Sequence, residues 1–208
     1  MELVEADCRC PSPDVVDYAV EVIRNGGLVV APTDTVYGIL VDPLNGDAVK
    51  RVYRVKKRSS DKPLPILLGE SHHALLLADP SPLFWRLALA FWPGPLTIVE
   101  KAKPGIPRHL EEWGNIGVRL PDCPLVREIA RRAGGLLVGT SANKSGMAPP
   151  TTAYEAHAQL GDRIDLYIDG GPSLRPIAST VVEIVDGRVE LLREGAIPYE
   201  KILGVLRG

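Results

Sequence analysis

The chain has 208 residues, of which 45% are hydrophobic and 24% charged, with a formal net charge of −2. This is ordinary globular usage, and the length suffices for one domain with a sizeable core, which we expect to span residues 1–208. The acidic balance argues against a protein that coats nucleic acid, because affinity for phosphate rises with the number of cations. We find no apolar run of roughly 20 residues and no secretory signal, so the sequence predicts a cytoplasmic protein without a membrane partner.

Apolar periodicity and turn residues divide the chain into alternating helices and short strands. The expected elements, in chain order, are a helix from Ser12-Pro13 to Asn25-Gly-Gly27, a strand at 28–31, a helix begun by Asn45 that runs to the basic residues near 56, a strand at 65–68, a helix at 82–92, strands at 96–100 and 116–120, a helix at 124–134, a strand at 136–139, strands at 180–185 and 188–192, and a short helix from 198. Asp186-Gly187 is a hairpin signal, which requires antiparallel pairing. We therefore predict an α/β fold with a twisted mixed sheet flanked by helices.

The segment Pro32-Thr-Asp-Thr-Val-Tyr-Gly38 is the first candidate for a site. It places the hydroxyls of Thr33, Thr35 and Tyr37 directly after a buried strand, where open α/β sheets tend to hold ligand contacts. Threonine and tyrosine also favour strands, so the stretch taken alone is slightly better explained as a plain strand.

A basic run at 51–58 ends the second expected helix. Cations are favourable at the negative end of a helix dipole, so a solvated helix end explains this run better than a site does when it is taken alone. The functional alternative concerns Lys56, Arg58 and Lys62, whose side chains are spaced to straddle a polyphosphate.

The strand at 136–139 opens into Thr140-Ser-Ala-Asn-Lys-Ser-Gly146, a small polar loop. Asn143 stands where a Walker A loop and a nucleophile elbow both need glycine, so neither motif is present. The cluster of donors suits a nucleotide or an oxyanion better than covalent catalysis, and a structural turn is a fair alternative.

Two arginines, Arg119 and Arg193, come at the ends of apolar strands. An unpaired buried guanidinium is costly, so each has either a carboxylate partner or an anionic ligand. The four histidines show no zinc-binding spacing. The three cysteines, Cys8, Cys10 and Cys123, make a disulfide scaffold unexpected, and plain thiols in a reducing compartment are the better interpretation.

Taken together in this order, the segments resemble the YrdC-like family, the L-threonylcarbamoyladenylate synthases of tRNA modification. The matching motifs are Pro32-Thr-Asp-Thr-Val-Tyr-Gly38, Lys56-Lys-Arg58, Trp92-Pro-Gly-Pro-Leu-Thr97, Gly117-Val-Arg-Leu-Pro121, Ser141-Ala-Asn143 with Ser145-Gly146, Ser179-Thr180 and Arg193-Glu-Gly195. The resemblance covers nearly the whole chain, and it implies the single-domain form of the family, with a mixed sheet around a basic cavity.

The resemblance further implies a reaction that joins L-threonine, bicarbonate and ATP into threonylcarbamoyl-AMP and releases pyrophosphate. A separate transferase would use the product, and the local basic run leaves room for a weak contact with tRNA. Carried over by motif, the threonine contacts are Thr33, Thr35, Arg119, Ser141 and Ser179, and the ATP contacts are Arg58, Lys62, Asn115, Asn143, Thr151 and Arg193. Lys56 and Arg58 are the candidate catalytic residues, which would supply charge beside the phosphates together with Mg²⁺ bound to ATP.

The chain departs from the family pattern at two positions. Leu67 stands where many relatives place a histidine that contacts threonine, and Ala178 stands where many have glutamate. Nucleotide binding is therefore better supported than threonine selectivity. Two alternatives remain open, an RNA-binding module for tRNA or double-stranded RNA, and a carbamoyltransferase domain that uses carbamoyl phosphate.

Overall fold

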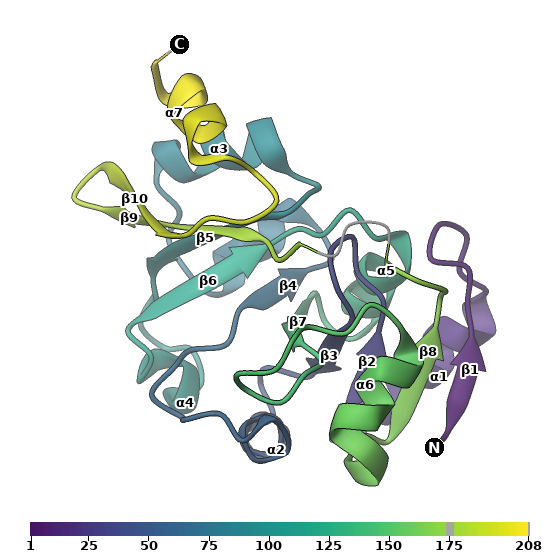
Figure 1. Cartoon of the computed structure of the whole chain (residues 1–208). Coiled ribbons are helices and arrows are strands. Elements are labelled where there is room, and N and C mark those ends of the chain that lie inside the picture. Colours follow the sequence, from purple (N-terminus) through teal and green to yellow (C-terminus); the bar gives the residue numbers. More distant parts are fainter. Residues whose placement is uncertain (174–176, 208) are drawn as a thin grey trace.

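Ten strands form one mixed sheet in a computed structural model that describes residues 1–173 and 177–207 (Figure 1). The strands are β1 (Leu3–Glu5), β2 (Val29–Ala31), β3 (Gly38–Val41), β4 (Ile66–Leu68), β5 (Leu96–Lys101), β6 (Asn115–Arg119), β7 (Leu136–Ser141), β8 (Leu166–Asp169), β9 (Thr180–Val185) and β10 (Arg188–Arg193). They lie side by side in the order β1-β8-β2-β3-β7-β4-β6-β5-β9-β10. Pairing is parallel for β1–β8, β8–β2, β4–β6 and β5–β9, and antiparallel for the other neighbours, which confirms the mixed sheet.

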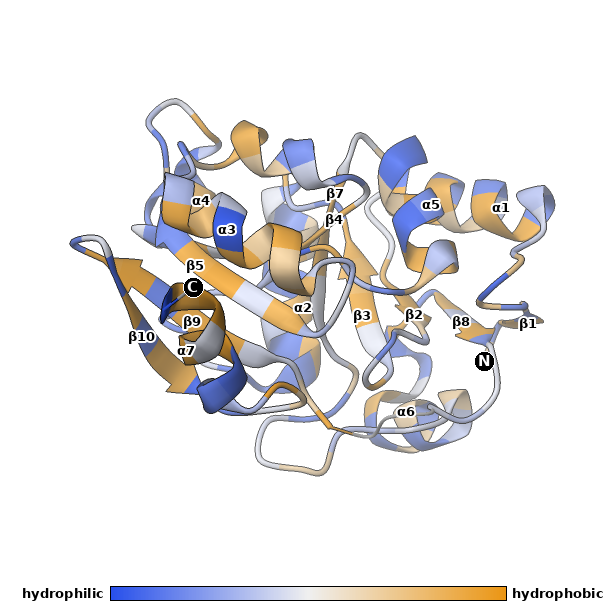
Figure 2. Cartoon of the chain, turned by 90° about the horizontal axis from the view of Figure 1, so that it is seen from above, coloured by the Kyte–Doolittle hydropathy of each residue, from blue (hydrophilic) through white to orange (hydrophobic). Residues whose placement is uncertain are grey.

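Helices cover both faces of this sheet. They are α1 (Pro13–Arg24), α2 (Gly46–Lys56), α3 (Pro82–Phe91), α4 (Arg108–Glu111), α5 (Pro124–Arg132), α6 (Ala153–Leu160) and α7 (Tyr199–Arg207), with 3₁₀ helices at Ser71–Leu76 and Gly161–Arg163. Helices α1 and α5 pack in one hydrophobic core, and α2, α3, α6 and α7 pack in the other. Figure 2 shows α1 and α5 on one side of β2, β3 and β8, with α6 on the opposite side.

Successive residues of the central strands alternate between these two cores. Val30 and Ile39 belong to the larger core, whereas Val29 and Leu40 belong to the core beneath α1 and α5. This is the two-residue period of a strand whose faces are both covered, and it explains why the sequence shows short continuous apolar runs. No helix within residues 1–173 and 177–207 is long and apolar enough to cross a bilayer.

Local capping fixes the helices that the sequence predicted best. The Ser12 hydroxyl accepts a hydrogen bond from Val15 N (3.4 Å), and the Asn45 side chain accepts from the amides of Asp47 and Ala48 (both 3.1 Å). Each cap satisfies backbone N–H groups that the first turn leaves without a partner. The predicted hairpin is also confirmed, because β9 and β10 pair antiparallel around Asp186 and Gly187, whose φ angles are 49° and 73°.

The structure differs from the predicted elements in two ways. Strand β7 continues to Ser141, two residues beyond the predicted end, so the polar loop begins while its backbone is still paired with β3. The pattern also gave no signal for β1, β3, β8, α4 or α6. Most of these are only three or four residues long, which is too short for a periodicity to be visible, and α6 begins just after Pro149-Pro150, behind a Thr152 cap.

Candidate functional site

A cavity of about 170 Å³ opens where β2, β6, β7 and β10 end beside the start of β3. Its lining residues are Thr33, Thr35, Val36, Tyr37, Gly38, Arg58, Pro65, Leu67, Arg119, Gly139, Thr140, Ser141, Pro149, Ala178, Ser179 and Arg193. Among the residues that the structure describes, the lining includes three arginines and no aspartate or glutamate. The cavity is therefore basic, as the sequence predicted, and its charge favours an anionic ligand.

The threonines after β2 form a small hydroxyl cluster on one wall. Thr33 Oγ1 donates to Val36 O (2.7 Å) and lies 3.0 Å from Thr35 Oγ1, while Thr35 N donates to Thr33 Oγ1 (3.1 Å). These bonds fold the polar segment into a tight turn before β3 begins at Gly38. The turn holds both hydroxyls at the cavity, and Thr35 is only 3% exposed.

Arg119 enters the cavity from the end of β6 and is held from behind by Asp34. Its guanidinium forms a buried ion pair with the Asp34 carboxylate, and it also donates to Gly94 O (3.0 Å) and Thr35 Oγ1 (3.3 Å). The side chains of Arg119 and Asp34 are 7% and 10% exposed. The sequence left open whether Arg119 meets a carboxylate or a ligand, and the structure shows both a carboxylate partner and a place in the cavity wall. Asp34 belonged to the predicted segment without an assigned role.

Among the described side chains, the positive charges of Arg193 and Arg58, unlike that of Arg119, are not neutralised by a carboxylate. Arg193 donates to Ser179 O (2.8 and 3.2 Å) and Ser179 Oγ (3.1 Å), and Arg58 donates to the carbonyls of Lys62 (3.3 Å) and Pro63 (3.1 Å). Neither has a carboxylate partner within the described residues. Burial, reinforced by the positive charges of Arg119 and Arg58, lowers the pKa of Arg193. The three guanidiniums therefore act on one another across the cavity, and an anion between them would relieve that repulsion.

Lys56 lies behind the cavity wall, although the sequence predicted that its charge would stand beside the phosphates. The side chain is 2% exposed, and its ammonium donates to Ser141 O and to Asn143 O (2.8 Å). Lys56 O accepts from Ser145 N (2.8 Å), so the end of α2 is bonded to the polar loop in both directions. Burial, with a smaller contribution from Arg58, lowers the pKa of Lys56 from 10.5 to about 8. Lys56 is therefore placed to position the loop.

Asn143 and Thr151 are close in sequence to residues that line the cavity. Asn143 is buried and its amide group donates to the carbonyls of Lys144 (3.0 Å) and Met147 (2.7 Å), which shapes the loop just past Ser141. Thr151 follows shortly after the lining residue Pro149, and its hydroxyl donates to Glu155 Oε2 (3.0 Å).

Four of the six predicted ATP contacts do not line the cavity, namely Asn143 and Thr151 together with Lys62 and Asn115. Lys62 is exposed, and its carbonyl rather than its amine meets Arg58. Asn115 is exposed at the start of β6, where its side chain donates to Glu183 Oε1 (2.6 Å). Four residues of extended strand, about 13 Å, separate Asn115 from Arg119, which explains why both cannot reach the same small cavity.

An apolar patch faces the arginines, and motif reasoning found only part of it. Leu67 on β4 is 3% exposed and covers Gly139 on β7, where an added Cβ would lie 2.2 Å from Leu67 Cγ. Pro65, Val36 and Ala178 extend this surface. The two departures from the family pattern, Leu67 and Ala178, therefore both face the cavity. Gly139 is required by the close approach of Leu67, a cross-strand contact that the sequence does not reveal.

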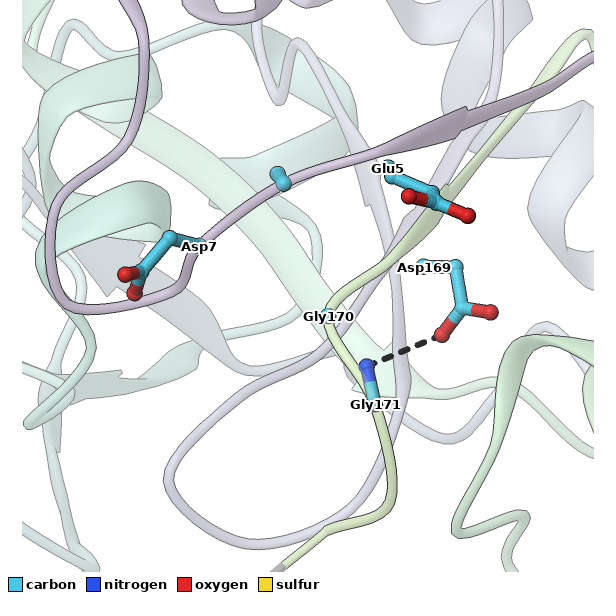
Figure 3. Close-up of a pocket in the computed structure, with 6 residues that line it drawn as sticks. Glu5, Asp7, Asp169, Gly170 and Gly171 are labelled. Carbon is cyan, nitrogen blue, oxygen red and sulfur yellow. Dashed lines mark hydrogen bonds between the residues drawn. The ribbon is translucent and has the colours of Figure 1, made fainter.

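A second hollow, of about 470 Å³, lies at the ends of β1 and β8 (Figure 3). Its carboxylates come from Glu5, Asp7 and Asp169, and Asp169 Oδ1 accepts from Gly171 N (2.9 Å). Three carboxylates repel a polyphosphate, so this hollow does not suit the predicted nucleotide. Within the described residues, no group of three or more His, Cys, Asp or Glu side chains is placed to hold a metal ion.

Comparison with known proteins agrees with the fold. A family described as "Telomere recombination", which groups Sua5, YciO and YrdC, matches residues 21–195. The threonylcarbamoyl-AMP synthase of Klebsiella pneumoniae is 35% identical over 186 residues, which are 88% of this chain and 96% of that protein. The threonylcarbamoyl-AMP synthase of Bacillus subtilis is 36% identical over 194 residues, which are 92% of this chain and 56% of that protein.

A solved structure, P. abyssi Sua5 complexed with L-threonine, superposes with a TM-score of 0.92 at 31% identity. It matches 99% of this chain, which spans 61% of that longer chain. A mixed sheet whose strand ends surround a basic, hydroxyl-lined cavity thus defines a nucleotide-handling α/β protein. The chain belongs to the Sua5/YciO/YrdC family.

Proposed function

We propose that this chain synthesises threonylcarbamoyl-AMP from L-threonine, bicarbonate and ATP, for the threonylcarbamoyladenosine modification of tRNA. The observation that carries the proposal is the cavity itself, where, among the described residues, three guanidiniums and a hydroxyl cluster converge and no carboxylate other than that of Asp34, behind Arg119, is paired with them. This combination suits a polyphosphate next to a small polar substrate. The names of the Klebsiella and Bacillus relatives support the same activity.

The reaction requires no nucleophile from the protein. The amine of threonine takes up carbon dioxide or bicarbonate as a carbamate, a carbamate oxygen attacks the α-phosphate of ATP, and pyrophosphate leaves. The protein holds the reactants in line and stabilises the charge that grows on the pyrophosphate. Arg58 and Arg193 are suited to the phosphates because neither charge is neutralised by a carboxylate partner in the described part of the chain.

The threonine side of the proposed site is the wall built by Arg119. Asp34 fixes the guanidinium, and Thr35 and Ser179 present hydroxyls to the same cavity. A guanidinium held in this way can pair with the carboxylate of an amino acid. Lys56 acts here as a positioning residue, because its ammonium fixes the carbonyls of the loop that carries Ser141.

ATP would arrive as its magnesium complex. No carboxylate of residues 1–173 or 177–207 lines the cavity, so we expect phosphate and water oxygens, rather than acidic side chains, to ligate Mg²⁺. The ion would neutralise part of the phosphate charge, and the arginines would neutralise more of it.

The decisive experiment mixes the protein with ATP, Mg²⁺, threonine and bicarbonate and looks for threonylcarbamoyl-AMP by mass spectrometry. Release of pyrophosphate that does not depend on threonine would contradict the proposal and favour a carbamoyl-transfer reaction instead. Tight, salt-sensitive binding of RNA in a gel shift, without ATP turnover, would favour the RNA-binding alternative.

Arg58→Ala tests the role of the basic element. A charge-assisted contact contributes roughly 1.5–3 kcal/mol, so we expect pyrophosphate release to fall at least about ten-fold. The matched control is Arg54→Ala. Arg54 is an exposed arginine on α2, four residues before Arg58, and it does not line the cavity. Equal rates for the two variants would remove Arg58 from the site.

A further inference from the structure

Two of the three cysteines lie together although they are far apart in the sequence. Cys8 belongs to the loop between β1 and α1, and Cys123 immediately precedes α5. The two segments are joined by a backbone bond from Leu125 N to Cys8 O (3.1 Å), and both side chains line the same cavity. The sequence alone predicted plain thiols, because nothing local relates Cys8 to Cys123.

The Cys123 sulfur is held against the end of β2 and the Cys8 sulfur against the end of the neighbouring strand β8. Cys123 Sγ donates to Pro32 O (3.6 Å), and Cys8 Sγ donates to Gly170 O (3.8 Å). A Cβ at Gly170 would lie 2.3 Å from Cys8 Sγ and 2.7 Å from Pro32 Cγ, so glycine is needed there for the sulfur to approach. The contacts of each thiol therefore restrict it to the neighbourhood of the other.

Both thiols also line a cavity of about 540 Å³ that adjoins the candidate site, since Thr33 lines both. Cys8 is half-buried and Cys123 is 3% exposed, so a small reagent reaches Cys8 first. The neighbouring Cys123 thiol, with a smaller contribution from Arg9, lowers the pKa of Cys8, whereas the neighbouring Cys8 thiol and burial raise the pKa of Cys123. Cys8 is therefore the better thiolate and Cys123 the proton-bearing partner.

We propose that Cys8 and Cys123 are a disulfide-forming site, oxidised by exchange with a small disulfide such as oxidised glutathione. The Cys8 thiolate attacks one sulfur of the glutathione disulfide, which forms a mixed disulfide and releases one glutathione thiolate. Cys123 then loses its proton and attacks Cys8 Sγ, which forms the Cys8–Cys123 bond and releases the second glutathione. Two protein thiols are oxidised, one glutathione disulfide is reduced to two thiols, and the atoms balance.

The Cys8–Cys123 bond would join the segment before α1 to the start of α5, close to Pro32. Cross-linking residues so far apart in the chain restricts the unfolded state strongly, so the folded protein gains stability. For a chain of this size we expect the midpoint of thermal unfolding to rise by about 10 °C. This inference is independent of the proposed synthase activity, because none of its steps involves ATP or threonine.

The test treats the intact protein with excess oxidised glutathione and then measures mass and thermal midpoint with and without reductant. We expect a mass lower by two hydrogen atoms, a Cys8–Cys123 peptide after digestion, and a midpoint that falls on reduction. Cys10→Ser is the matched control, because Cys10 is exposed and outside this contact, and it should keep the whole effect. Cys8→Ser should abolish it. A stable glutathione adduct on Cys8, a bond to Cys10, or an unchanged midpoint in the oxidised protein would overturn the proposal.

Discussion

The buried ammonium of Lys56 can be tested by its dependence on pH. In the folded protein its pKa is lowered from 10.5 to about 8, because burial disfavours the charged form. At about 1.36 kcal/mol for each whole step in pKa, the charged ammonium reduces the free energy of unfolding by about 3 kcal/mol relative to the neutral amine. Between pH 8 and 10.5 the unfolded chain binds a proton at this site that the folded chain does not. The contribution of Lys56 to stability therefore increases as the pH rises through that window.

Replacing Lys56 with methionine removes both this titration and the hydrogen bonds. The carbonyls of Ser141 and Asn143 would lose their donor, at roughly 1–3 kcal/mol each, while removal of the buried charge offsets much of that loss at neutral pH. We therefore expect a modest destabilisation at pH 7.5 and one larger by about 2–3 kcal/mol at pH 10. The Michaelis constant for ATP should rise at both values, because the loop is no longer fixed.

Urea unfolding of the wild type and of Lys56→Met at pH 7.5 and 10 measures the difference in free energy of unfolding between the two proteins at each pH. Lys50→Met is the control, because Lys50 lies on the same helix with its side chain 72% exposed. A difference between wild type and Lys56→Met that does not change with pH would show that the amine is not held as described. An unchanged Michaelis constant for ATP would show that the loop fixed by Lys56 does not contribute to nucleotide binding.

Three further changes test the walls of the cavity. Asp34→Asn leaves the buried guanidinium of Arg119 uncompensated, so we expect a loss of roughly 3–5 kcal/mol by urea unfolding and a weaker affinity for threonine; an unaltered affinity would contradict the role of this pair. Gly139→Ala places a Cβ about 2.2 Å from Leu67 Cγ and should destabilise by about 1–3 kcal/mol, whereas in a Leu67→Ala background the same change should cost little; an equal cost in both backgrounds would show that the close contact is misplaced. Tyr37→Phe removes a hydroxyl that donates to Gly171 O (2.7 Å) and accepts from Gly170 N (3.1 Å), so stability should fall by roughly 1–3 kcal/mol and hydrogen exchange at Gly170 should accelerate, whereas unchanged exchange would argue against this bond.

The parts of the fold that could be predicted are those with local causes. The Ser12 and Asn45 caps lie within a few residues of the amides they satisfy, and the hairpin at Asp186 is set by a two-residue turn. Such signals depend only on residues that are close together in the sequence. Strands β1 and β8 lack them, because each is defined only by pairing with a distant strand.

The same distinction applies to the site. Arg119 was singled out because a guanidinium at the end of an apolar strand needs a partner, and this physical requirement does not depend on the rest of the fold. The burial of Lys56 and the exposure of Asn115 could not be predicted, because they depend on how α2 meets the loop after β7 and on which end of β6 borders the cavity. The contact of Cys8 with Cys123 was hidden for the same reason.

The place of Arg193 at the end of the outermost strand has a consequence for the order of events during synthesis. The cavity takes Thr33, Arg58 and Arg119 from the earlier part of the chain, but Ser179 and Arg193 from the region around β9 and β10. A ribosome releases these residues after the others, and within the described part of the chain β10 is held in the sheet by β9 alone. A growing chain therefore has an incomplete set of these cations until β10 has paired. Nucleotide binding would thus report that β9 and β10 have joined the sheet, which makes retention on immobilised ATP a direct assay for this folding step.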